Sequence, residues 1–384
     1  MRINHFIEEL NKLTDTSNFR TLKNYESNSC FILDKGRKML NLSSNDYLGI
    51  GGNSAFSREF AADCKFDFCG STSSRLLTGN HKIYTELENL LASVYQRQSA
   101  LVFNSGYNAN VGILPALTQK GDLILADKLV HASIIDGLKL SNAQVVRYRH
   151  NDYEHLEKLL QKHTDLNGNI FIVSESIFSM DGDLCELHKL IDIKKKYNAF
   201  LYLDEAHAVG IRGNKGLGIA EENDLIGDID FIIGTFGKAY ASQGAYIICD
   251  KLFADYLTNK MRSLIFTTAL PPISIAWTKF VFEKTLDMQD SRLAVKKIAD
   301  NFVCGIKAKG YNINSQSQIV PFMVYDNEKS ILLAEDFQQK GFYVLPVRPP
   351  TVPDGTARLR FSLNATIKPE HINSILNILP DNKQ

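Results

Sequence analysis

Residues 199–207 read AFLYLDEAH, a run of five apolar residues that ends at Asp204. A run this short is typical of a strand, and its unbroken apolarity indicates burial on both faces, as in a parallel sheet. A carboxylate directly after such a strand loses hydration and needs a cation or several donors nearby. The stretch therefore predicts both a parallel sheet and a polar site at its edge.

Six further apolar runs have the same character, and they lie at 100–103, 122–126, 144–148, 170–175, 230–235 and 245–249. Amphipathic segments with helical spacing separate several of them, as at 152–163 and 185–197. This alternation predicts an α/β fold with a mostly parallel, seven-stranded sheet that helices cover on both faces.

The chain has 384 residues, which is more than one small domain needs. A helical stretch at about 273–309 contains no strand pattern, and shorter α/β elements follow it, with a strand at 357–363 and a helix from Pro369. We expect three parts: an N-terminal arm at 1–50, a large domain at 51–280 and a smaller C-terminal α/β domain at 281–384.

The charges balance, with 43 Lys and Arg against 43 Asp and Glu, so nothing indicates binding to nucleic acid or to an anionic membrane. The N-terminus is acidic where a signal peptide would be apolar, and no stretch approaches the roughly 18 apolar residues of a membrane span. The six cysteines are scattered, with Cys64 and Cys69 the closest pair, which indicates reduced thiols and no metal site. We expect a cytoplasmic protein.

Ligands of open α/β sheets bind at the carboxyl ends of the strands. Four expected strands end in polar residues, which are Asn104-Ser105-Gly106-Tyr107, Ser174-Glu175-Ser176, Asp204-Glu205-Ala206-His207 and Thr235-Phe236-Gly237-Lys238. One sheet edge is therefore expected to gather a carboxylate, an amine and an imidazole.

Asp204 and Lys238 are the main candidates at this edge. A pyridinium N–H would supply the partner that a buried Asp204 needs, and the pairing would keep that ring electron-withdrawing. Lys238 follows an apolar strand, where partial burial favours the reactive free amine, and Thr235 could bind a phosphate from the same loop. Taken alone, Asp204 could equally cap a loop or helix, and Lys238 could be a solvated surface residue.

Gly106 and Tyr107 precede a helix that begins near Asn108, and helix N-termini bind phosphate through free N–H groups. A plain strand–helix turn is the alternative. His131 begins another helix, where its ring could stack on a planar cofactor, and His207 could reach a phenolic oxygen of such a cofactor. Structural roles are the alternative for both histidines.

Arg358 and Arg360 alternate along the late strand and so lie on one face, while Arg348 lies upstream. An arginine of the small domain is suited to bind a substrate carboxylate through two hydrogen bonds. A surface ion pair is the alternative.

Several strings, in this order, resemble the α-oxoamine synthases, a fold-type I pyridoxal-phosphate family, from about residue 20 to 375. They are NLSSNDYLG at 41–49, GSTSSRLLTGN at 70–80, FSMDGD at 178–183, DEAHAVG at 204–210 and TFGKA at 235–239. SRLLTGN at 74–80 and RPPTVPDGTARLRF at 348–361 look most like the branch that condenses L-alanine with a pimeloyl thioester of CoA or a carrier protein in biotin biosynthesis.

The resemblance implies a catalytic set around pyridoxal 5′-phosphate: Lys238 as the Schiff-base lysine and proton-transfer base, Asp204 at the pyridine nitrogen, His131 stacked on the ring and His207 at its phenolic oxygen. It also implies that further residues hold the phosphate and ring, namely Gly106, Tyr107, Ser179 and Thr235.

The resemblance further implies a homodimer with shared sites, in which Thr268 reaches the phosphate of the other subunit. Arg360 would bind the amino-acid carboxylate. Other substrate contacts are implied for Arg20, Asn45, His131, Arg348 and Thr351.

The chain departs from the family in two places, with Tyr84 where a histidine is frequent and GSTSS at 70–74 where GSGGS is commoner. A glycine-using member, such as 2-amino-3-oxobutyrate CoA ligase (glycine C-acetyltransferase), is the alternative within the family. DEAH at 204–207 also occurs in nucleotide-dependent helicases, but their phosphate loop GxxxxGK[ST] is missing because Ala239 follows Gly237-Lys238.

Overall fold

The computed structural model describes residues 3–28, 30–34, 36–63, 69–163 and 167–382. The chain divides into two compact units: the large unit is Asn53–Ser179 with Leu184–Arg292, and the small unit is Met1–Gly52, Met180–Asp183 and Leu293–Gln384. The chain therefore passes from one unit to the other four times. The expected N-terminal arm at 1–50 belongs to the same unit as most of the expected C-terminal domain.

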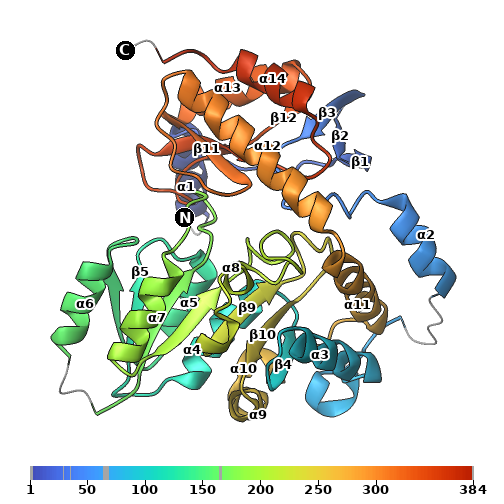
Figure 1. The fold of residues 1–384 in the computed structure, drawn as a ribbon. Helices are drawn as coiled ribbons and strands as arrows, with labels where there is room; N and C mark the ends of the chain where they lie inside the picture. Colours follow the sequence, from blue (N-terminus) through green and yellow to red (C-terminus); the bar gives the residue numbers. More distant parts are fainter. Residues whose placement is uncertain (1–2, 29, 35, 64–68, 164–166, 383–384) are drawn as a thin grey trace. The chain divides into compact units, whose positions relative to one another are not determined.

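The seven apolar runs of the sequence all form strands of one sheet in the large unit (Figure 1). The strands are β4 (Ser99–Phe103), β5 (Leu123–Asp127), β6 (Gln144–Tyr148), β7 (Ile170–Glu175), β8 (Phe200–Asp204), β9 (Phe231–Thr235) and β10 (Ala245–Cys249). Their order is β4-β10-β9-β8-β7-β5-β6. Neighbours from β9 to β6 are parallel, and β10 is antiparallel to both β9 and β4. The predicted mostly parallel, seven-stranded sheet is confirmed.

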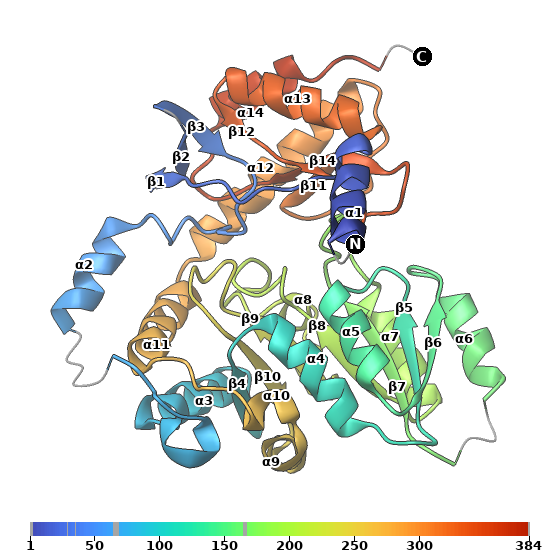
Figure 2. The same ribbon diagram turned by 180° about the vertical axis from the view of Figure 1, so that it is seen from behind.

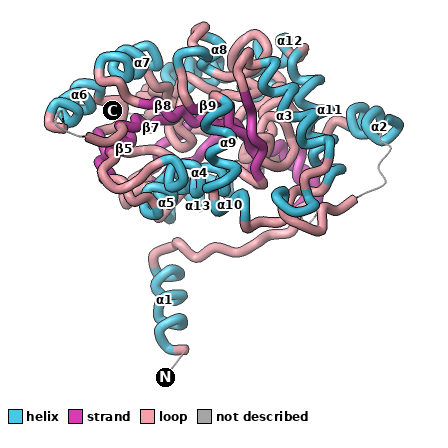
Figure 3. The backbone as a smooth tube through the Cα atoms, turned by 90° about the horizontal axis from the view of Figure 1, so that it is seen from below, coloured by secondary structure: helices cyan, strands magenta, loops and turns pink. Residues whose placement is uncertain are grey.

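Helices cover this sheet on both sides, because strands that are apolar on both faces need two covering layers. Figure 3 shows α6, α7 and α8 on one side of the strands and α4, α5 and α9 on the other. The helices of the large unit are α2 (Ser54–Asp63), α3 (Lys82–Val94), α4 (Gly106–Leu117), α5 (Ala132–Leu140), α6 (Tyr153–Gln161), α7 (Leu187–Lys196), α8 (Ile219–Glu222), α9 (Lys251–Lys260), α10 (Arg262–Ile265) and α11 (Pro272–Leu286), with a π-helix at Arg75–Gly79 and a 3₁₀ turn at Ile226–Asp228.

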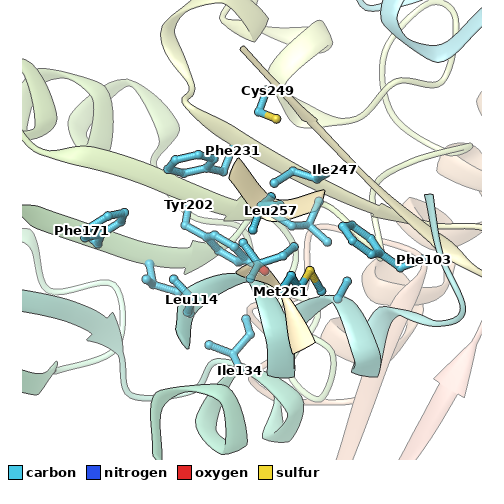
Figure 4. Close-up of a cluster of buried hydrophobic side chains, with 14 of the residues drawn as sticks. Phe103, Leu114, Ile134, Phe171, Tyr202, Phe231, Ile247, Cys249, Leu257 and Met261 are labelled. Carbon is cyan, nitrogen blue, oxygen red and sulfur yellow. The ribbon is translucent and has the colours of Figure 1, made fainter. Parts of the chain in front are cut away.

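The layer between the sheet and α4, α5, α9 and α10 is the main hydrophobic core of the large unit. Phe103, Phe231 and Ile247 from the strands meet Leu114 of α4 and Leu257 of α9 there (Figure 4). Figure 2 shows α4 and α5 side by side, and both begin next to strand ends. This packing holds the N-termini of both helices at the carboxyl edge of the sheet.

One strand differs from its expected environment. The sequence predicts the run at 144–148 as a buried strand, but β6 exposes most of its residues. The reason is its position, since β6 is the edge strand of the sheet and pairs only with β5. The sequence of this run predicts that it forms a strand, but it does not predict that the strand lies at the edge of the sheet.

Within the described residues, the small unit comprises two sheets and four helices, and the first residues of one of these helices, 289–292, are counted with the large unit. One sheet has the order β1-β2-β3-β12 and the other β11-β14-β13. The strands are β1 (Glu26–Asn28), β2 (Phe31–Asp34), β3 (Arg37–Asn41), β11 (Ile319–Tyr325), β12 (Phe342–Tyr343), β13 (Pro346–Val347) and β14 (Ala357–Ser362), and the helices are α1 (Asn4–Asp15), α12 (Gln289–Ala308), α13 (Asn327–Gln339) and α14 (Pro369–Ile378).

Residues from both ends of the chain share the core of the small unit. Leu40 and Leu42 pack in one apolar cluster with Phe302, Phe337 and Phe361. β3 pairs in parallel with β12, opposite Phe342. The N-terminal strands are therefore part of the folded unit, whereas α1 has no buried residue.

The expected helical stretch at 273–309 is two helices, α11 and α12, with a break after Leu286. The predicted strand at 357–363 and the helix from Pro369 are both present.

Of the described cysteines, Cys185 and Cys249 are buried and Cys69 and Cys304 are exposed, while Cys64 lies outside the described residues. Within the described part of the chain, no helix is both long and apolar enough to cross a membrane. The same part holds no cluster of three or more metal-binding side chains.

Candidate active site

A cavity of about 170 Å³ lies at the carboxyl edge of the large sheet, between the ends of β7, β8 and β9 and the N-terminal turns of α4 and α5. Seven residues that the sequence predicts to hold the cofactor line it: Gly106, Tyr107, His131, Asp204, His207, Thr235 and Lys238. Five other lining residues have no predicted role: Asn110, Ser133, Glu175, Ala206 and Ile233.

The first turn of α4 forms one end of the cavity. Ser105 caps the helix, and its hydroxyl accepts the N–H of Asn108 at 3.1 Å. The N–H groups of Gly106 and Tyr107 precede that capped amide and belong to the helix end that attracts anions. A Cβ built on Gly106 would lie 3.8 Å from the Thr235 hydroxyl oxygen, so Thr235 faces this turn without filling it. The arrangement suits a phosphate group.

Asp204 ends β8 and is 5 % exposed. Its Oδ1 accepts the N–H of Ala206 at 2.9 Å, and its Oδ2 accepts a side-chain N–H of Asn110 at 2.8 Å. Each carboxylate oxygen has a further lone pair, so the side chain is held in one orientation and can still accept a proton-bearing ring nitrogen.

Lys238 lies in the connection between β9 and β10. Its Nζ is 2.9 Å from Nε2 of His207, which follows β8. Thr235 stabilises the same connection through its hydroxyl. The hydroxyl donates to the Gly244 carbonyl at 3.1 Å and accepts the N–H of Gly237 at 3.3 Å. The predicted lysine and histidine thus meet at the edge of the sheet.

His131 caps α5, and its Nδ1 is 2.7 Å from the Ser133 hydroxyl. Part of His131 is exposed to solvent, but the surrounding protein removes much of the water around its ring, and this desolvation is the largest cause of a lowered pKa of His131. The charge of Asp204 opposes this shift, and the charge of Lys238 lowers the pKa further. A neutral imidazole at this position suits stacking on a planar cofactor.

Glu175 ends β7 next to Asp204 and is 3 % exposed. Its carboxylate accepts the backbone N–H of His131. Burial, together with the charge of Asp204, raises the pKa of Glu175 well above its usual value. Sequence reasoning named this residue only as a strand end, although its position beside Asp204 follows from the parallel register.

Two predicted cofactor residues do not line the cavity. Ser179 is 7 % exposed and lies in the loop after β7, next to Phe178. Thr268 is exposed, and its carbonyl accepts a side-chain N–H of Asn104 at 2.7 Å. The role of Thr268 at the site of a second subunit stays a prediction.

Both departures from the family pattern contact the segment that carries Thr268. The Tyr84 hydroxyl accepts the N–H of Leu270 at 2.7 Å, and the carbonyl of Ser73, one of the two changed residues of the 70–74 string, accepts the N–H of Ala269 at 2.9 Å. Burial raises the pKa of Tyr84 to about 12. Tyr84 and the 70–74 string therefore anchor residues 268–270.

Of the predicted substrate residues, His131 lies in the large unit and the other five lie in the small unit. Arg360 of β14 donates to Ser362 Oγ at 2.7 Å and to Asn45 Oδ1 at 3.3 Å. Arg358, on the same face of the strand, forms an ion pair with Asp181 at 2.6 Å and is 5 % exposed. The ion pair that we considered for this strand thus involves Arg358, whose side chain is buried, whereas the side chain of Asp181 is 37 % exposed.

Arg20, Arg348 and Thr351 come together although they are far apart in the sequence. Arg20 Nη2 donates to Thr351 Oγ1 at 3.0 Å, and Arg348 donates to the Ser17 carbonyl. Burial and the nearby Arg20 lower the pKa of Arg348. Among the described residues, neither arginine has a carboxylate within ion-pair distance. Two adjacent cations without an acidic partner are suited to bind an anion.

Comparison with known proteins identifies relatives over nearly the whole chain. Residues 37–379 match the family model for class I and II aminotransferases. The chain is 48 % identical over 387 residues to the 8-amino-7-oxononanoate synthase of Haemophilus ducreyi, covering 98 % of this chain and 100 % of that protein.

Solved structures share the fold. A serine palmitoyltransferase variant from S. paucimobilis with a bound PLP–myriocin aldimine superposes with a TM-score of 0.89 at 31 % identity, covering 98 % of this chain and 96 % of the other. The 8-amino-7-oxononanoate synthase of Francisella tularensis gives a TM-score of 0.73 at 28 % identity, covering 88 % and 96 %.

Proposed function

The chain belongs to the class I and II aminotransferase family, and on that premise we propose that it is a pyridoxal-phosphate enzyme that makes 8-amino-7-oxononanoate from L-alanine and a pimeloyl thioester. The observation that carries this proposal is that Lys238, Asp204, His131 and His207 all line one cavity, beside the N-terminus of α4.

The residues present fit this cofactor. The N–H groups at the start of α4 and the Thr235 hydroxyl suit its phosphate, and the held carboxylate of Asp204 suits its ring nitrogen. His131 offers a neutral ring for stacking, and Lys238 supplies the amine for covalent attachment. When bound, pyridoxal phosphate supplies an electron sink that stabilises negative charge on the neighbouring substrate carbon.

Lys238 has two tasks in this proposal. Its Nζ holds the cofactor until the amino acid replaces it, and it then takes the proton from the alanine Cα. His207 lies within hydrogen-bond distance of Nζ and helps to orient it. Asp204 keeps the proton on the ring nitrogen, because an ionised carboxylate stabilises a cation beside it.

The overall reaction joins the alanine Cα to the carbonyl carbon of the thioester. The bond from that carbonyl to sulfur breaks, and the thiol leaves. The proton taken from the Cα leaves with the thiol. The alanine carboxylate then leaves as CO₂, and one proton from solvent replaces it on the former Cα, so that atoms and charge balance.

We propose that Arg360 binds the alanine carboxylate, with Asn45 beside it. The pimeloyl chain ends in a second carboxylate, and the adjacent Arg20 and Arg348 with Thr351 are suited to bind it or the thioester. This pair of cations supports a dicarboxylic acyl chain over the acetyl group of the glycine-using alternative. We further propose that the enzyme is a cytoplasmic homodimer with shared sites, in which Thr268 serves the other subunit.

The test replaces the proposed attachment residue. We expect K238A to bind pyridoxal phosphate without the visible absorbance of the lysine-bound cofactor and to release thiol at a negligible rate. K251A is the matched control, since Lys251 is a surface lysine with a side chain 70 % exposed. Near-normal turnover of K238A would refute the role of this residue.

A substrate comparison separates this enzyme from its relatives. Wild-type protein is mixed with alanine, glycine or serine, each with pimeloyl-CoA, with acetyl-CoA or without a thioester, and cofactor absorbance and thiol release are followed. Alanine with pimeloyl-CoA is expected to give the fastest release. Faster release with glycine and acetyl-CoA would favour the alternative.

A further inference from the structure

Asn110 lies inside α4, is 2 % exposed and lines the cavity. Its side chain forms three hydrogen bonds with residues from two other elements. The amide nitrogen donates to Asp204 Oδ2 at 2.8 Å and to Ser133 Oγ at 3.0 Å, and the amide oxygen accepts the Tyr202 hydroxyl at 2.5 Å. The side chain thus connects β8 with α5.

The partners determine which way the amide points. A carboxylate only accepts hydrogen bonds, so the NH₂ group of Asn110 must face Asp204. The oxygen then faces Tyr202, whose buried hydroxyl supplies a donor. Both N–H bonds of the amide are used, one on Asp204 and one on Ser133.

The same network of hydrogen bonds extends from Ser133 to His131, and the donor of each bond can be assigned. Because Ser133 Oγ accepts from Asn110, its single proton is left for His131 Nδ1, 2.7 Å away. The backbone N–H of Ser133 also donates to Nδ1, at 3.2 Å. Two donors on Nδ1 require that this nitrogen carries no proton, so the proton of a neutral His131 ring is on Nε2.

We propose that Asn110 is a positioning residue that fixes the Asp204 carboxylate and, through Ser133, the tautomer of His131. The side-chain amide of Asn110 thereby sets the orientation of Asp204, which the proposed function places at the ring nitrogen of the cofactor. It also sets the tautomer of His131, which the proposed function places on the face of that ring. The inference about Asp204 and the cofactor rests on that proposed function. The inference about the His131 tautomer rests only on the contacts within the large unit.

The first test reads the tautomer directly. Protein labelled with ¹⁵N-histidine is studied by NMR without cofactor, and the His131 signals among the nine histidines are assigned with H131Q. We expect wild-type His131 to carry its proton on Nε2. N110A should give a mixture of tautomers, because the Ser133 hydroxyl is then free to rotate away from Nδ1.

The second test measures cofactor affinity with the full chain. N110A removes a hydrogen bond to a charged group, so pyridoxal phosphate should bind about ten- to a hundredfold more weakly. S133A keeps the bond from Asn110 to Asp204, and it should change the tautomer of His131 with an affinity change of less than about threefold. The two variants therefore separate the two branches of the network.

N108A is the matched control, since Asn108 lies on the same helix and its side chain does not line the cavity. It should match wild type in both measurements. The proposal is wrong if His131 carries its proton on Nδ1 in the wild type, or if N110A gives the spectra and affinity of N108A. If N110A does not fold, S133A decides, and an unchanged His131 tautomer in S133A overturns the proposal.

Failure of the proposed function is distinguishable from failure of this inference. A wild-type chain that does not bind pyridoxal phosphate would refute the proposed function. The tautomer in the protein without cofactor would be unaffected by that result.

Discussion

Asp204 and Glu205 are adjacent in the sequence and have different tasks. Asp204 faces the cavity, whereas Glu205 is fully buried and accepts the Ser176 hydroxyl and the N–H groups of Ile219 and Ala220. A carboxylate with these partners joins the end of β8 to the start of α8. Of the two acidic residues in the DEAH string, Asp204 therefore belongs to the proposed active site, and Glu205 has a structural role.

Glu205 is expected to make stability depend on pH. Burial raises the pKa of Glu205 from 4.5 to about 7. A raised folded-state pKa means that the contribution to stability is complete below pH 4.5 and is lost as the pH rises through about 7. Linkage sets this contribution at about 3 kcal/mol at most.

The E205Q variant tests this expectation by denaturant unfolding between pH 4.5 and 8. Its unfolding free energy should fall less over this range than that of the wild type. E154Q is the control, because the Glu154 side chain is 89 % exposed. Parallel pH profiles of E205Q and wild type would contradict the assignment.

Tyr84 is expected to stabilise the segment that carries Thr268. Its hydroxyl satisfies the buried N–H of Leu270, so Y84F leaves that donor without its partner and should cost about 1–3 kcal/mol in unfolding free energy. Y256F is the control, since Tyr256 is 45 % exposed. Equal stability of the two variants would show that the Tyr84 hydroxyl contributes nothing.

At the scale of elements, the close approach of α4 and α5 sets the geometry of the cavity. A Cβ on Gly137 of α5 would lie 2.3 Å from the carbonyl oxygen of Asn110 on α4. Only glycine permits this distance, which in turn allows the side chain of Asn110 to reach Ser133. The helices α4 and α5 are therefore in close contact at Asn110, the residue whose side chain also donates a hydrogen bond to Asp204.

G137A should destabilise the protein although alanine is the better helix former. The intrinsic gain of about 1 kcal/mol is smaller than the overpacking cost of about 1–3 kcal/mol, and a shift of α5 also moves His131. We expect a lower melting temperature and weaker cofactor binding. G227A, where a Cβ meets nothing within 4 Å, should change stability by less than about 0.5 kcal/mol.

The elements also show what the sequence could predict. All seven strands were predictable, because each is a short apolar run between polar segments, and their ends gave Asp204, Lys238 and the start of α4. Asn110 and Ser133 were not predictable, since they lie inside helices and acquire their partners only through the packing of α4 on β8 and α5. Resemblance, and not spacing, supplied the roles of Ser179 and Thr268, and these roles remain predictions.

At the scale of the whole molecule, the small unit depends on segments that are far apart in the sequence. β3 pairs with β12, and Leu40 and Leu42 belong to the same core as Phe361. A deletion of residues 1–42 should therefore strongly lower the thermal stability of the small unit and expose residues 293–384 to proteolysis.

Deletion of residues 1–15 is the matched control for that truncation. It removes only α1 and adjoining residues, and this helix has no buried residue, so the melting temperature should stay as in the full chain. Equal stability of the two truncations would show that the N-terminal strands contribute little to the small unit.

Because the small unit is built from segments that are far apart in the sequence, it cannot be completed until late in synthesis on the ribosome. After residue 52 is made, residues 53–292 must be made before the C-terminal segment of the small unit, residues 293–384, which takes on the order of 10–50 seconds at typical elongation rates. During this time β3 has an open edge and no β12 to pair with, and Leu40 and Leu42 have no core. The nascent N-terminal segment is then a natural client for a chaperone, and its sheet is completed only when one of the last strands of the chain is made.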